Sequence, residues 1–148
     1  MYDTDRHDAD ACARAWQTLR MAHDRVAERL GADLSAECAL AINEFDVLLY
    51  LRTHQNEAVR ITALLEAVSL SQPALSRLVG RLESRGLLAR SATEVDGRAT
   101  TLCLTDAGIA LTDRAIAVHA AAVHESLTGK FSEEEQVALL ELLAQVGR

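Results

Sequence analysis

Ser71 to Leu104, with the sequence SQPALSRLVGRLESRGLLARSATEVDGRATTLCL, decides the fold of this chain. The hydroxyl of Ser71 can cap a helix, and Pro73 falls in the first turn, where a missing N–H does no harm. Apolar residues then recur at the spacing of one buried helix face, at Leu75, Leu78, Val79 and Leu82. We therefore expect a helix with one face in a core and another face open to a partner.

The second half of this stretch predicts a β-hairpin. Gly86 can adopt the left-handed conformation that ends a helix, and Leu87–Arg90 follows as a short strand. Thr100–Leu104 alternates polar and apolar residues over most of its length, and Asp96–Arg98 lies at the expected tip between the strands. We expect a hairpin with a basic tip.

The residues before Ser71 complete a recognisable motif. Arg60–Val68 predicts a short helix, and Ser69–Ser71 predicts a tight turn in front of the capped helix. Helix, turn and helix in so short a span, followed by a hairpin, are typical of a winged helix-turn-helix.

Long helices are predicted on both sides of this unit. Gly31–Ala41 is expected to be a break between the first and second helices, and Asn43 is expected to cap the second helix. Thr105 can cap a long helix, and Ser132–Glu135 forms a capping box for the last one. The first helix has apolar or aromatic positions at steps of three and four, the seam of a helix packed lengthwise on another: Trp16, Leu19, His23, Val26 and Leu30. The expected fold class is mainly α with a small β-hairpin.

Composition and charge limit the range of functions open to this chain. The 148 residues are 49% apolar with one proline, which favours a folded helical protein, and no apolar run approaches the roughly 20 residues of a membrane span. A cytoplasmic location is expected. The net charge is −7, yet Ser71–Arg98 holds five arginines against three carboxylates. An acidic body with one locally basic element is compatible with DNA binding through that element.

Other chemistries find little support in the sequence. The three cysteines, Cys12, Cys38 and Cys103, form no C-x-x-C pair, so we expect buried thiols rather than disulfides or zinc ligands. His119 and His124 are five residues apart and do not share a helix face as metal ligands would. Redox sensing by Cys12 is disfavoured, because the acidic neighbours Asp8 and Asp10 would raise the pKa of its thiol rather than lower it. We expect no metal, no cofactor and no enzymatic activity.

Four segments resemble the MarR family of winged-helix transcriptional regulators: Glu44–Leu48, Leu78–Leu87, Asp96–Ala99 and Leu104–Gly108. The resemblance covers nearly the whole chain. It implies a homodimer that reads a pseudo-palindromic site on double-stranded DNA. It also implies an N-terminal dimerisation helix and connector in residues 1–42, a winged helix-turn-helix in 43–105 and C-terminal dimerisation helices in 106–148.

The same resemblance assigns DNA-binding residues. The family wing resembles Asp-x-Arg-Arg, and Gly97 replaces its first arginine, so Arg98 is expected in the minor groove with Asp96 orienting it. Arg81 is expected on the DNA backbone. The groove-entering end of the recognition helix would supply Gln72, Pro73, Ala74, Ser76 and Arg77. Arg85 and Arg90 have an alternative interpretation, as salt bridges with Glu83, Glu94 or Asp106.

A fainter resemblance concerns an effector. Trp16, Asp46 and Arg90 look like residues of the urate-responsive branch of the family, and an indole with an arginine suits a flat aromatic or anionic ligand. The alternative is structural, with Trp16 in a core, Asp46 complementing a helix dipole and Arg90 in an ion pair.

The sequence thus predicts a sequence-specific DNA-binding regulator, a repressor released from DNA by a small ligand. The second hypothesis is a winged-helix homodimer that binds a protein or small molecule and not DNA. The acidic net charge and Gly97 motivate this alternative.

Overall fold

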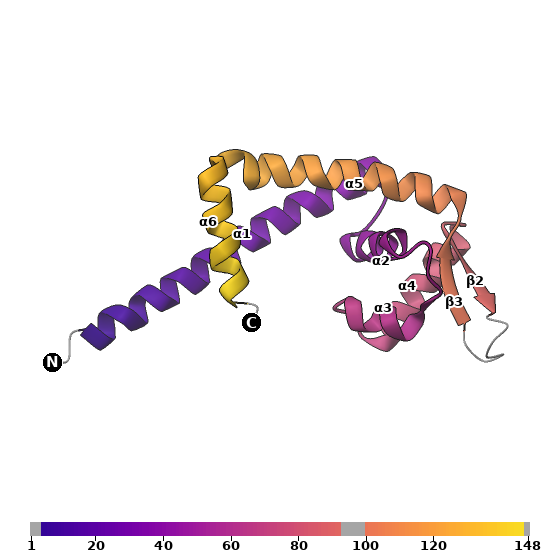
Figure 1. Ribbon diagram of the computed structural model, residues 1–148, viewed down its shortest axis with the longest axis horizontal. Coiled ribbons are helices and arrows are strands. Elements are labelled where there is room, and N and C mark those ends of the chain that lie inside the picture. Colours follow the sequence, from indigo (N-terminus) through magenta and orange to yellow (C-terminus); the bar gives the residue numbers. More distant parts are fainter. Residues whose placement is uncertain (1–3, 93–99, 147–148) are drawn as a thin grey trace. The chain divides into compact units, whose positions relative to one another are not determined.

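The computed structural model of the chain describes residues 4–92 and 100–146 (Figure 1). The protein is mostly helical, with a small antiparallel sheet. Its elements are α1 (Thr4–Cys38), α2 (Ile42–Thr53), β1 (Val59–Arg60), α3 (Ile61–Ala67), α4 (Gln72–Ser84), β2 (Leu88–Ala92), β3 (Thr100–Leu104), α5 (Asp106–Ser126), the 3-10 helix η1 (Thr128–Lys130) and α6 (Glu133–Val146). The predicted fold class is confirmed.

The chain divides into two compact units, and both boundaries fall inside helices. One unit combines Met1–Ala32 with Ala121–Arg148, and the other is Asp33–Ala120. We call the second the winged-helix unit, because it holds α2, α3, α4 and the sheet. The predicted borders at residues 42 and 105 stay predictions about domains.

The winged-helix unit is built around a leucine-rich core. The predicted inner face of α4 is fully buried or nearly so, and it packs with Phe45 and Leu48 of α2 and Leu64 of α3. Each fully buried leucine or phenylalanine contributes about 1.5–3 kcal/mol relative to an exposed one. Figure 1 shows α2, α3 and α4 beside β2 and β3. This burial leaves α4 with only one side open to a partner.

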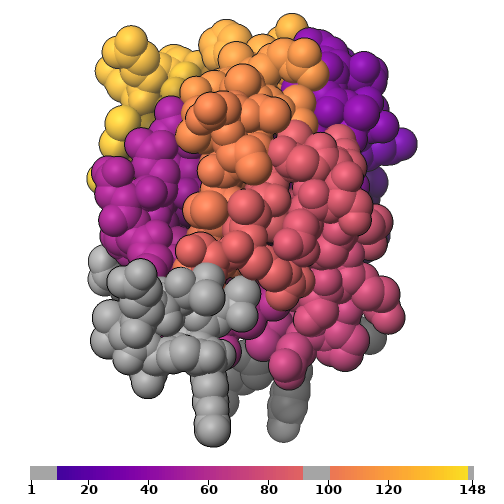
Figure 2. Space-filling model, turned by 90° about the vertical axis from the view of Figure 1, so that its right-hand side faces the viewer, coloured from indigo at the N-terminus to yellow at the C-terminus, as the bar shows by residue number. Residues whose placement is uncertain are grey.

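The sheet has three strands in the order β1-β3-β2, all antiparallel. Leu88 pairs with Leu104, and Val59 of β1 pairs with Leu102 from the other side of β3. Figure 2 looks onto this region, where β3 and the start of α5 lie beside β2 and α4. The hairpin was predicted, whereas β1 was not, because two residues are too short to show an alternating pattern.

Two predicted boundaries near the N-terminus are wrong. α1 does not stop at Gly31 but continues to Cys38, because the buried Leu30 and Leu34 outweigh the cost of a helical glycine, about 1 kcal/mol. Ala39 then ends the helix with φ 51°, and the Leu40 N–H donates to the Leu34 carbonyl at 3.3 Å.

α2 begins one residue before the predicted Asn43 cap. Ala41 is its N-cap, and the carboxylate of Glu44 accepts the Ala41 N–H at 3.1 Å. The side chain of Glu44, in the first turn, therefore satisfies a backbone N–H at the start of α2, where Asn43 was the expected capping residue.

The predicted starts of α4, α5 and α6 are confirmed, whereas α3 is shorter than the predicted Arg60–Val68, because Arg60 belongs to β1 and Val68 caps the end of the helix. Ser71 is the N-cap of α4, although its hydroxyl makes no capping bond, and Gly86 has φ 70°. The Thr105 hydroxyl accepts the Gly108 N–H at 3.1 Å and donates to the Gly86 carbonyl at 2.6 Å. In the capping box of α6, Ser132 N–H donates to Glu135 at 2.8 Å, and the Glu135 N–H returns to the Ser132 hydroxyl at 3.3 Å.

The unit formed by the chain ends carries apolar side chains in solvent. Trp16 is 66% exposed and Leu19 40%, although both lie on the seam predicted for α1. On α6 the exposed apolar residues are Val137, Leu140, Leu142, Leu143 and Val146. Within the described residues, no helix is long and apolar enough to span a bilayer.

Gly108 lies against the chain at the start of α5. A Cβ atom at this position would overlap the backbone carbonyl of Leu87, which cannot move without shifting the strand that follows. The Leu87 carbonyl also accepts the Thr105 N–H at 3.1 Å. Position 108 therefore requires glycine for space, not for backbone conformation.

We predict that Gly108→Ala lowers the free energy of unfolding by about 3 kcal/mol, because the methyl group must displace the backbone. Gly80→Ala is the matched control, since a Cβ there meets nothing within 4 Å and should add about 1 kcal/mol of helix stability. Urea denaturation measures both. Equal effects of the two substitutions would contradict the prediction.

Candidate nucleic-acid interface

The N-terminal half of α4 presents polar side chains to solvent. Gln72, Pro73, Ser76 and Arg77 are exposed, and Ala74 is half-buried, while Leu75 between them is fully buried. The buried face thus fixes which residues point outward. The five residues predicted at the groove-entering end lie together on the open part of this helix.

Arginines continue along the same helix. Arg77, Arg81 and Arg85 line one shallow surface depression together with Gly80 and Ser84. These arginines follow one another at steps of four residues, which places them in a row on one helix face. Such a row presents a strip of positive charge of the kind that engages phosphates.

The three arginines differ in their partners. Arg85 donates to Glu44 at 3.3 Å and to the Ala39 carbonyl at 3.0 Å, and Arg81 lies 3.6 Å from the same Glu44 carboxylate. Arg77 has no ion-pair partner among the side chains that the structure describes. It is therefore the arginine of this row most available to a ligand.

Sequence reasoning missed the role of Glu44. Its spacing from the start of α2 is that of a capping glutamate, a signal that was present in the sequence. Its contact with Arg85 joins residues 41 positions apart, and no local pattern reveals such a pair.

The predicted wing tip lies outside the described residues. Asp96, Gly97 and Arg98 fall between β2 and β3, in residues 93–99. The minor-groove contact of Arg98 and the orienting role of Asp96 stay predictions.

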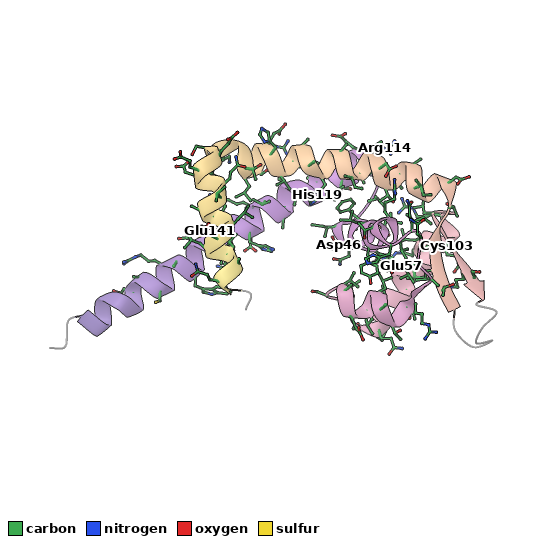
Figure 3. The ribbon with its side chains drawn as sticks, in the orientation of Figure 1. Asp46, Glu57, Cys103, Arg114, His119 and Glu141 are labelled. Atoms are coloured by element: carbon green, nitrogen blue, oxygen red, sulfur yellow. The ribbon has the colours of Figure 1, made fainter. Side chains whose placement is uncertain are left out.

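The three residues predicted for an effector occupy different places. Trp16 is an exposed residue of α1, so it is not the core residue of the alternative interpretation. Arg90 on β2 donates to Glu83 at 3.0 Å, which is one of the ion pairs of the alternative interpretation of this residue. Asp46 lies on α2 (Figure 3).

Asp46 borders a pocket of about 410 Å³ within the winged-helix unit. α2 lines one side, and the end of α3 with the following turn lines the other. The lining residues are Asn43, Asp46, Leu49, Tyr50, Thr53, Ala67, Val68, Ser69 and Leu70. Arg90 is not among them. The pocket offers apolar walls, an aromatic ring and several hydrogen-bonding groups.

Two carboxyl groups in this unit have pKa values shifted in opposite directions. Partial burial raises the pKa of Asp46, and the nearby His119 of α5 offsets part of this rise. For Asp113, the hydrogen bond from Arg52 at 2.8 Å lowers the pKa. The folded state therefore disfavours the charge on Asp46 and favours it on Asp113.

We predict that Asp46→Asn raises the melting temperature at pH 7. A raised pKa stabilises the fold below the unfolded pKa of about 3.9, and this contribution is lost as the pH rises through the folded pKa, so the benefit of Asn should shrink toward pH 4. Asp113→Asn is the control of opposite sign and should lower the melting temperature at pH 7. Thermal unfolding followed by circular dichroism at both pH values checks the pair, and a shift of the same sign for both variants would refute it.

The cysteine predictions are only partly right. Cys38 is buried as expected, but Cys12 and Cys103 are exposed, because α1 and β3 each leave one side uncovered in the single chain. Among the described residues, no group of three His, Cys, Asp or Glu side chains is placed to hold a metal ion.

The chain is similar to known transcriptional regulators in sequence and structure. Residues 40–99 match the MarR family. An uncharacterized HTH-type transcriptional regulator of Bacillus cereus is 35% identical over 107 residues, 72% of this chain and 69% of that protein.

Two DNA-bound structures share the fold. Sco3205, a MarR family transcriptional regulator from Streptomyces coelicolor in complex with DNA, has a TM-score of 0.82 and 24% identity over 91% of this chain and 88% of that chain. The transcriptional repressor CouR, bound to a 23-mer DNA duplex, has a TM-score of 0.78 and 30% identity, with 88% and 90% covered.

A helix-turn-helix, an antiparallel wing and an exposed polar helix face together define the class of winged-helix transcriptional regulators. Within that class the chain belongs to the MarR family. Its relatives are transcription regulators and not enzymes, which confirms the expectation from the sequence.

Proposed function

We propose that this protein is a sequence-specific DNA-binding transcriptional repressor that acts as a homodimer on a pseudo-palindromic operator in the bacterial cytoplasm. The observation that carries the proposal is the exposed polar end of α4 with Arg77 unpaired among the described side chains. An α-helix with this surface fits the major groove, where Gln and Arg side chains can hydrogen-bond to base edges and Ser can hold a phosphate.

Charge supports the same orientation on DNA. Ser71–Arg98 has a surplus of arginine, whereas the whole chain is acidic with a net charge of −7. Phosphates would attract the first and repel the rest, so only one face can approach the duplex. The alternative, a dimer that does not bind DNA, leaves this basic surface without a role.

Exposed apolar side chains support the homodimer. Leu140 is 68% exposed and Val146 76%, and Trp16 adds an exposed indole in the same unit. Surfaces of this kind are costly in water and mark protein contacts. A second copy of the chain is the partner that a palindromic operator requires, because it supplies the second α4.

The pocket beside Asp46 supports release by a small ligand. Its volume suits a molecule of metabolite size, and Tyr50 offers an aromatic wall. A ligand that binds better to a form unable to span both half-sites would shift the population away from DNA. The chemical identity of the ligand calls for a screen, since the lining suits hydrogen-bonding aromatic molecules in general.

Selection of duplexes from random DNA, followed by mobility-shift assays across a salt series, tests the proposal. We expect an enriched sequence with two related half-sites and an affinity that falls with salt. Binding of all duplexes alike, or of none, would favour the alternative of a dimer without operator recognition.

We predict that Arg77→Ala and Arg98→Ala each weaken binding to the selected duplex about ten-fold, the effect of losing one base or phosphate contact. Arg114→Ala is the matched control, because Arg114 is an exposed arginine on α5 (Figure 3) whose loss changes the net charge equally. Fluorescence anisotropy measures all three. An equal loss for Arg114→Ala would remove the assignment to α4 and the wing.

We predict that Leu140→Asp dissociates the dimer, because a buried carboxylate in an apolar contact costs more than about 2 kcal/mol. Gln145→Asp adds the same charge at a polar position of α6 and should leave the dimer intact. Sedimentation velocity distinguishes the two species. A monomeric wild type would contradict the dimer itself.

A further inference from the structure

Glu44 is a buried acidic residue at the junction of α2 and α4. Its side chain is only 10% exposed. One carboxylate oxygen accepts both the Ala41 N–H at 3.1 Å and Arg85 at 3.3 Å, and the other lies 3.6 Å from the Nε of Arg81. A single carboxylate thus serves a helix N-terminus and two arginines of the row on α4.

The two arginines are held with different strength. Arg85 has two acceptors, Glu44 and the Ala39 carbonyl, and its side chain is 35% exposed. Arg81 is 58% exposed and reaches Glu44 only at a distance beyond a good hydrogen bond. Arg81 can therefore turn toward another anion while Arg85 stays in place.

Glu44 itself cannot follow either arginine. It is anchored by the Ala41 N–H, and its charge complements the N-terminal end of the α2 dipole. Moving this carboxylate into solvent would leave the Ala41 N–H without that partner. The acid is thus a fixed negative charge behind the arginine row.

We propose that Glu44 is a positioning residue that competes with DNA phosphate for Arg81 and thereby sets the affinity and salt dependence of DNA binding. It keeps Arg85 as a structural side chain and leaves Arg77 as the fully available arginine of the row. The inference rests on the proposed function, in which α4 binds DNA. Glu44 acts without touching the duplex.

The charge on Glu44 is removed, and the shape of its side chain kept, in Glu44→Gln. The amide oxygen of Gln can still accept the Ala41 N–H, so the start of α2 is preserved. Arg81, no longer held, gains one phosphate contact. At about 150 mM salt we expect three- to ten-fold tighter binding to the duplex selected for the wild type, and a plot of log K against log salt steeper by about 0.9.

The same substitution in an Arg81→Gln background is the decisive control. If Glu44 acts through Arg81, Glu44→Gln changes neither affinity nor salt slope in that background. Glu83→Gln removes an equal charge from the exposed face of α4, where the partner is Arg90, and its effect should persist without Arg81.

Three results would overturn the proposal: an unchanged affinity in Glu44→Gln, a gain that survives Arg81→Gln, or an unchanged salt slope. Circular dichroism checks that Glu44→Gln is folded. If it is not, Glu44→Asp serves instead, because the shorter acid stays charged but withdraws from Arg81 and should also tighten binding. Failure of the wild type to bind any selected duplex would refute the proposed function, a result distinct from these three.

Discussion

Burial of one face of α4 is the constraint on which the rest of the winged-helix unit depends. Leu75, Leu78, Val79 and Leu82 take up the whole inner side of the helix. Once that side is buried, the helix cannot rotate about its axis, so its polar residues face away from the core in a single direction. Packing of the core therefore sets the direction of the exposed polar face of α4, and the residues that fix this direction need not face the partner.

Ion pairs distinguish the arginines that core packing leaves exposed on α4. The arginine row of α4 is graded from its N-terminal to its C-terminal end, from Arg77 without a described partner to Arg85 with two acceptors. The buried Glu44 behind the row is the acidic partner of both Arg81 and Arg85, and the Ala39 carbonyl is the second acceptor of Arg85. Arg85, with two acceptors, is held within the unit, whereas Arg77 is available for recognition and Arg81 lies between these two cases, so the arginines of one helix differ in their tasks.

Local signals predicted local structure well. The Thr105 cap and the Ser132 capping box act within four residues, and both are predicted by the sequence. Ser71 marks the start of α4 by its position, without a capping bond from its hydroxyl. The errors at Gly31 and Asn43 arose where tertiary burial or a neighbouring glutamate overrode a local preference. The contact of Glu44 with Arg85 and the exposure of Cys12 and Cys103 depend on distant parts of the chain, which no periodicity encodes.

The close approach of Gly108 to the Leu87 carbonyl has a consequence for genetic screens. In a saturation library selected for DNA binding, this position would tolerate no side chain and would score as strictly as a residue that contacts a base. Its intolerance would report only that two stretches of backbone touch. Sorting the library first by the amount of folded protein would separate such positions from those that recognise an operator.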